Sequence, residues 1–229
     1  MIRAPRGVRA AAAGAAAGLV LAAPAGAAST AGPKAPYTDR AVVGSIGLCN
    51  RAGRQVTSGS VNAKPFAWRA VSTAAAPAPY DNAWRTATLF AFQPRRGLTA
   101  RAWSGTALTA SSRYSNPAHP MAAATFADES LKDFMAVFEP KWQGFLQLRL
   151  YLGTKDAAIY SAHYAALDIK VTGQRWRAVG GGPVDCTSGT AKSLETIVHS
   201  ASAASPAPSA STPSEPGTVP RSSSKGHRS

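Results

Sequence analysis

Two tryptophans beside basic residues are the side chains best suited to contacting a ligand. Trp84 precedes Arg85 in a loop-like stretch, and Trp142 follows Lys141. An exposed aromatic ring next to a cation can stack on a sugar ring or hold a protein partner. Tryptophan is also highly buried on average, so for both residues core packing is an equal alternative. Core packing is the better expectation for Trp68, Trp103 and Trp176.

Few other residues have the types and spacing that catalysis needs. His163 lies close to Tyr160 and Tyr164 in the sequence and is a candidate contact residue, although a surface or packing role suits it better. Glu129 and Asp133 stand four positions apart, where two carboxylates can form an acid and base pair or simply face water. No hydrolase, zinc or phosphate-loop motif occurs. The sequence therefore predicts no catalytic residue, no metal and no cofactor.

The N-terminus has the three parts of a secretory signal peptide. Arg3, Arg6 and Arg9 form a positive region, a weakly apolar stretch follows, and Ala25 and Ala27 supply small residues before a cleavage point. We predict a signal peptide over 1–27 and a short linker over 28–36. The apolar stretch is shorter than the ~20 residues of a membrane-spanning helix. We therefore expect cleavage, no transmembrane anchor in the mature chain, and a secreted or cell-envelope location.

Export makes the two cysteines informative. Cys49 and Cys186 have 136 residues between them. In an oxidising compartment an even number of cysteines favours a disulfide, and the alternative is two separate buried thiols. We expect the disulfide.

Alternation with a period of two predicts most of the secondary structure. Over 145–152 every even position is Leu, while Gln147, Arg149 and Tyr151 face the other way, as in a half-buried strand. Further strands are expected over 41–48, 66–71, 86–92, 98–103, 167–172 and 175–179. The last two are joined by a loop short enough for a hairpin.

Two segments have helical spacing instead. Leu131, Phe134 and Met135 begin an amphipathic pattern that Asp128 can cap and Pro140 ends. A second short helix is expected over 190–198.

Many strands with two short helices predict an all-β domain, an antiparallel β-sandwich over 37–198. A βαβ fold is disfavoured because it needs a helix between successive strands. All the Trp, Phe and Tyr residues fall within this range. The Ser- and Pro-rich stretch over 199–229 cannot bury enough apolar surface to fold, and we expect a disordered tail.

The charge of the chain points to anionic partners. Eighteen Lys and Arg against ten Asp and Glu give the region 37–198 a net charge of +8. A basic surface favours anionic partners, or it merely keeps an exported domain soluble. Export and the dispersed charge disfavour nucleic acid. The expected partner is an anionic cell-wall polymer or another envelope protein.

Several short sequence segments resemble known sequences. They lie at 47–50, 65–71, 89–95, 142–149 and 186–187, and include Pro65-Phe66-Ala67-Trp68 and Trp142-Gln143-Gly144-Phe145. With them, the region 41–198 resembles a group of uncharacterised secreted or cell-surface proteins of actinobacteria. The resemblance implies export and a compact β fold, and it implies no activity and no catalytic residue.

The favoured function is therefore a non-enzymatic exported domain that binds an envelope component or another protein. A secreted hydrolase that uses scattered carboxylates or His163 is the alternative. A nucleic-acid binder is the least favoured of the three.

Overall fold

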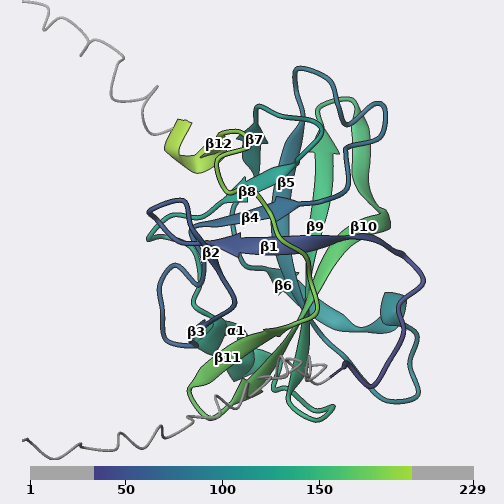
Figure 1. Cartoon of the computed structure of the whole chain (residues 1–229). Coiled ribbons are helices and arrows are strands. Elements are labelled where there is room, and N and C mark those ends of the chain that lie inside the picture. Colours follow the sequence, from purple (N-terminus) through teal and green to yellow (C-terminus); the bar gives the residue numbers. More distant parts are fainter. Residues whose placement is uncertain (1–33, 198–229) are drawn as a thin grey trace, which may run out of the picture. The chain divides into compact units, whose positions relative to one another are not determined.

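The computed structural model describes residues 34–197, which form a β-rich domain (Figure 1). The expected signal peptide, most of the linker and the Ser/Pro-rich tail lie outside the described residues, and for them the sequence predictions stand untested.

The described region contains twelve strands and two short helices, and a further helical segment covers residues 194–197. The strands are β1 (Val42–Cys49), β2 (Gln55–Val56), β3 (Ser58–Ser60), β4 (Arg69–Ser72), β5 (Thr86–Gln93), β6 (Ser104–Ala107), β7 (Ser112–Tyr114), β8 (Met121–Ala123), β9 (Phe145–Thr154), β10 (Ala157–Thr172), β11 (Arg175–Val179) and β12 (Ala191–Ser193). The helices are a 3-10 turn, η1 (Ala100–Ala102), and α1 (Leu131–Val137).

These strands belong to one large sheet that is nearly barrel-shaped. Its main path runs β12-β7-β5-β9-β10-β1-β4-β8, with β2, β3, β6 and β11 attached at its sides. Among the described pairs, β1 beside β10 is parallel and the others are antiparallel. The predicted all-β class is confirmed.

A serine hydroxyl joins β7, next to one end of this path, to β8 at the other end. Ser112 on β7 donates a hydrogen bond to the carbonyl of Ala123 on β8 at 3.0 Å. The same hydroxyl accepts one from the Ala123 N–H at 2.9 Å. Side-chain hydrogen bonds thus link β7 to β8 in place of backbone ones, and they bring the two ends of the sheet together.

The interior of the curled sheet is filled as the alternation of β9 predicts. Leu146, Leu148, Leu150 and Leu152 all face it and are buried. They pack with apolar residues of the neighbouring strands, among them Leu89, Ile46, Leu167 and Ile169.

The prediction that β9 is half-buried is wrong, because its other face is covered as well. Gln147 and Arg149 are each only 2% exposed. The cover comes from the segment Tyr37–Ala41 and from the stretch around η1, which both contact Arg149 directly.

The strand predicted over 98–103 is also wrong. The chain there forms η1, with Ala102 N–H bonded to the Thr99 carbonyl at 2.9 Å, and β6 begins only at Ser104. Ala and Arg favour helical over extended backbone, which accounts for the local turn. The strand predicted over 167–172 is the end of the much longer β10.

The amphipathic helix is confirmed as α1, with Leu131 and Phe134 buried. Its cap is Ser130 rather than Asp128. The Ser130 hydroxyl accepts from the Asp133 N–H, and the Asp133 carboxylate accepts from the Ser130 N–H, which is a capping box. Asp128 instead accepts bonds from the Ala110 and Thr125 N–H groups.

Within the second predicted helix, only the end is helical. Ala191–Ser193 form β12, which pairs with β7, and residues 194–197 are helical as far as the structure describes them.

The predicted disulfide is present. Cys49 ends β1 and Cys186 lies in the loop after β11, with Cα atoms 5.9 Å apart. Both residues belong to the buried core. The bridge ties the first strand of the sheet to the last part of the described chain.

Removing the disulfide should destabilise the fold. Because it links positions 137 apart, the variant Cys49→Ser/Cys186→Ser should lose about 2–5 kcal/mol of unfolding free energy. Urea denaturation followed by tryptophan fluorescence measures this loss. Denatured, unreduced protein should show no free thiol, and two titratable thiols per chain would contradict the bridge.

Candidate functional site

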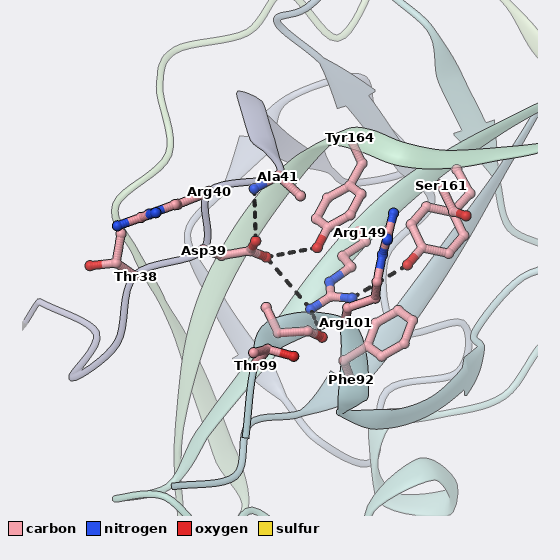
Figure 2. A pocket seen from close by; sticks show the side chains of 12 residues that line it. Thr38, Asp39, Arg40, Ala41, Phe92, Thr99, Arg101, Arg149, Ser161 and Tyr164 are labelled. Carbon is pink, nitrogen blue, oxygen red and sulfur yellow. Dashed lines mark hydrogen bonds and ion pairs between the residues drawn. The ribbon is translucent and has the colours of Figure 1, made fainter. Parts of the chain in front are cut away.

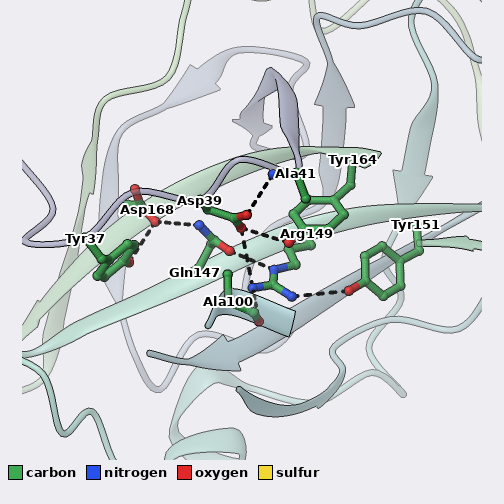
Figure 3. A network of polar contacts seen from close by, with 9 residues as sticks. All are labelled: Tyr37, Asp39, Ala41, Ala100, Gln147, Arg149, Tyr151, Tyr164 and Asp168. Carbon is green, nitrogen blue, oxygen red and sulfur yellow. Dashed lines mark hydrogen bonds and ion pairs between the residues drawn. The ribbon is translucent and has the colours of Figure 1, made fainter. Parts of the chain in front are cut away.

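The covered face of β5, β9 and β10 carries a polar network with Arg149 at its centre (Figure 3). Tyr151 lies on the same face of β9, and Phe92 and Tyr164 extend it onto β5 and β10. This is the outer face of the curled sheet, opposite the four leucines of β9. An arginine placed here by strand alternation is buried only because other segments fold over it.

The guanidinium of Arg149 is held on several sides. Its Nε donates to Gln147 Oε1 at 2.7 Å, and its Nη2 donates to the Ala100 carbonyl at 2.9 Å. Its Nη1 lies 3.4 Å from the Tyr151 hydroxyl. The guanidinium carbon also lies over the rings of Phe92, Tyr164 and Trp103, at 4.0, 4.6 and 5.3 Å from their centres. Hydrogen bonds and aromatic faces together replace its water shell.

Asp39 supplies the opposite charge. Its Oδ2 lies 3.6 Å from Arg149 Nη2, and the two side chains are 4% and 2% exposed. The same carboxylate accepts bonds from the Tyr164 hydroxyl at 2.8 Å and the Ala41 N–H at 3.0 Å. Both ions are desolvated, and each is compensated by the other and by neutral donors or acceptors.

Tyr37 fixes the other end of the covering segment, Tyr37–Ala41, which we call the strap. Its hydroxyl donates to Asp168 Oδ1 at 2.8 Å, and Gln147 Nε2 donates to the same oxygen at 3.2 Å. The Tyr37 ring packs against Trp103, Trp142 and Phe145. The strap is therefore attached to the sheet by two carboxylates and an aromatic cluster.

Burial sets the protonation of this network. It raises the pKa of the Asp168 carboxyl, although the hydrogen bonds from Tyr37 and Gln147 oppose it. It also raises the pKa of the Tyr37 and Tyr164 hydroxyls, so both remain donors at neutral pH. Asp168 lies within β10, directly opposite Gln147 on β9.

A cavity of about 640 Å³ opens beside Arg149 (Figure 2). Its walls combine three arginines, one carboxylate, hydroxyls and aromatic rings: Arg40, Arg101, Arg149, Asp39, Thr38, Thr99, Ser161, Phe92, Tyr151 and Tyr164, with Ala41 and Ala100. Three positive charges and one negative charge leave a net charge of +2 on the lining.

The donors in this cavity outnumber the acceptors. Arg40 and Arg101 are exposed, and no ion pair to either occurs among residues 34–197. No described group accepts the hydroxyl hydrogen of Tyr151, which receives only the long contact from Arg149. A ligand that offers anionic oxygens would complement this lining.

The three contact residues predicted from the sequence lie at separate places. Trp84 is 50% exposed, and its ring faces Arg113 at 4.7 Å and Lys155 at 5.2 Å. Trp142 is half-buried against Tyr37 and lines a second cavity of about 410 Å³, with Arg95, Arg96, Lys141 and Gln143.

His163 is exposed and lines a smaller cavity of about 170 Å³ beside Val43, Pro77 and Leu150. Tyr164 lines both this cavity and the one at Arg149. Among the described residues, no carboxylate hydrogen-bonds to His163.

Glu129 and Asp133 do not share the helix, because Glu129 is exposed and precedes the helix cap Ser130. Asp133 is engaged in the capping box with Ser130, and the hydrogen bonds from Ser130 lower the pKa of its carboxyl. In residues 34–197 no three side chains of His, Cys, Asp or Glu gather as a metal site would require. None of the described helices has the length and apolar character that crossing a membrane demands.

The sequence does not predict the Arg149 site, because the residues on that face of β9 are polar and suggest exposure to solvent. The neighbouring strand, β5, indicates that the face is covered. Phe90 and Phe92 alternate with buried Ala87, Leu89 and Ala91 on β5. Large aromatic residues on the supposed solvent face indicate that something covers it.

Breaking the buried ion pair should be costly. Asp39→Ala leaves the Arg149 charge buried without its partner, which should lower the unfolding free energy by about 3–5 kcal/mol. Urea denaturation measures the loss. Asp156→Ala is the matched control. The side chains of Asp156 and Lys155 are 75% and 57% exposed, so this ion pair should contribute less than about 1 kcal/mol. Equal losses for the two variants would contradict this assignment.

The chain was also compared with known proteins. No protein-family model, no curated protein and no solved structure matches it.

Proposed function

We propose that this domain is exported and acts at the cell envelope as a non-enzymatic binding module. Its ligand is an anionic polymer built from acidic sugars, and the cavity beside Arg149 receives a carboxylate-bearing unit of that polymer.

One observation carries this proposal, which is the unbalanced positive charge of the cavity. Asp39 compensates Arg149, whereas Arg40 and Arg101 stand exposed at the cavity without an ion pair among the described residues. Arginine is suited to carboxylates because its planar fork donates two parallel hydrogen bonds.

The remaining lining favours a sugar over a simple ion. Arg149 covers one face of the Phe92 ring, but the Tyr151 ring also lines the cavity and offers apolar surface on which the face of a sugar ring can pack. Ser161 and Thr99 add hydroxyls for the sugar's own hydroxyl groups.

The envelope location is supported by features outside the cavity. The Cys49–Cys186 bridge is of the kind that persists in oxidising compartments. The predicted signal peptide and the resemblance to secreted or cell-surface proteins of actinobacteria agree with it. Acidic envelope polymers are then the anions that a domain of charge +8 meets.

The hydrolase alternative has less support. In the cavity, Asp39 is bound by Arg149, Tyr164 and the Ala41 N–H, so it is committed to the fold. His163 lies beyond Tyr164 in a different cavity.

The proposal predicts binding of polygalacturonate, a linear polymer of an acidic sugar, and not of neutral dextran. Arg40→Gln/Arg101→Gln should weaken that binding by at least about tenfold, since each charge-assisted hydrogen bond contributes about 1.5–3 kcal/mol. Isothermal titration calorimetry measures the affinity. Raising the salt from about 50 mM to about 300 mM should weaken binding of the unmodified chain as well.

A matched control removes two exposed cations elsewhere. Arg54→Gln/Lys132→Gln makes the same change in net charge, and both side chains are exposed away from the cavity. This control should retain most of the affinity. Equal weakening by both double variants would show that binding depends only on net charge, which would contradict a specific site. Binding of dextran as tight as that of polygalacturonate would also contradict the proposal.

A further inference from the structure

The hairpin formed by β10 and β11 carries a second concentration of positive charge. Lys170 lies directly opposite Arg177, and Thr172 lies directly opposite Arg175. Directly opposed residues of an antiparallel pair point to the same face of the sheet. Three cations therefore share one face of a short hairpin.

The third strand extends the pattern. β3 pairs with β11 on its far side, so that Arg177 is opposite Ser58 and Arg175 is opposite Ser60. Two rows result across β10, β11 and β3, namely Lys170–Arg177–Ser58 and Thr172–Arg175–Ser60. Each row combines hydroxyl and cationic donors.

These side chains surround a cavity of about 260 Å³. Its lining is Ser58, Lys170, Thr172, Arg175, Trp176 and Arg177, which includes three positive charges and no carboxylate. The two ion pairs of the described region, Arg149 with Asp39 and Lys155 with Asp156, leave all three cations out.

The Asp168 carboxylate, on the same strand as Lys170, is already engaged. Asp168 precedes Lys170 by two positions and so shares its face of β10, but its Oδ1 accepts from Tyr37 and Gln147. The Lys170 ammonium lies instead over the ring of Phe145, 5.6 Å from its centre.

Such an arrangement is unfavourable for the isolated fold. Like charges directly opposite one another across two strands repel, and this destabilises the pair. An anion bound between the cations attracts each of them and so offsets their repulsion. Arginine forks and hydroxyl donors without a competing acceptor suit the oxygens of a phosphate group.

We infer that the β10–β11 hairpin is a binding site for phosphate groups, presented by a phosphate-rich polymer. Trp176 is the only large apolar residue in the lining, and it is 2% exposed. No side chain of this cavity is therefore placed to insert into a lipid bilayer, which favours a dissolved polymer over a membrane surface. The site is separate from the cavity beside Arg149 and does not depend on the function proposed for it.

The experiment uses tripolyphosphate as the probe. Tripolyphosphate should raise the melting temperature of the purified chain in a saturable manner, beyond the effect of sodium chloride at equal ionic strength. Arg175→Gln/Arg177→Gln should lose this rise and should bind tripolyphosphate at least about tenfold more weakly in calorimetry. Without the anion this variant should melt no lower than the unmodified chain, because it removes a repulsion.

Two further variants complete the design. Lys170→Gln should also weaken tripolyphosphate binding, whereas Arg54→Gln/Lys132→Gln should leave it nearly unchanged. Arg40→Gln/Arg101→Gln should also leave it nearly unchanged, so failure of this site and failure of the proposed function are distinguishable. The inference would be overturned by equal responses of the hairpin variant and the unmodified chain. It would also be overturned by binding only to phosphatidylglycerol vesicles, or by a melting shift that chloride reproduces.

Discussion

The buried ion pair between Arg149 and Asp39 is the interaction on which the site depends. Strand alternation places Arg149 on the outer face of the sheet, where a charge would ordinarily meet water. The strap and the turn around η1 exclude that water, so the guanidinium needs a counter-charge and hydrogen-bond acceptors close by. Asp39, Gln147 and the Ala100 carbonyl supply them. The contacts of Asp39 with Arg149 and Tyr164 also hold the strap on the sheet.

The shape of the cavity follows from this constraint. Because the strap must bring Asp39 to Arg149, it also places Arg40 in the lining of the cavity, to which the η1 turn contributes Arg101 from another side (Figure 2). Fold stability and the proposed ligand contact thus fall to neighbouring residues, since the Asp39 side chain is buried and Arg40 is exposed. Because Asp39 pairs with Arg149, it does not pair with Arg40 or Arg101, and these two exposed side chains are available for the proposed ligand.

Much of the fold could be predicted from the sequence, because it depends on local patterns. The leucines of β9 predict the inner face, the spacing of α1 predicts its buried residues, and two cysteines in a chain expected to be exported predict the bridge. The site could not be predicted in the same way. Its partners, Asp39 and Arg149, are distant in sequence, and the covering of a polar strand face is a tertiary event. Only Phe90 and Phe92 signalled it.

A double-mutant cycle on Asp39 and Arg149 tests this account most directly. It compares the unfolding free energies of Asp39→Asn, Arg149→Met and the double variant with that of the unmodified chain. If the two charges compensate each other, the double variant should lose less than the sum of the single losses, by at least about 1 kcal/mol. Losses that add within about 0.5 kcal/mol would contradict the account, because the two residues would then act independently.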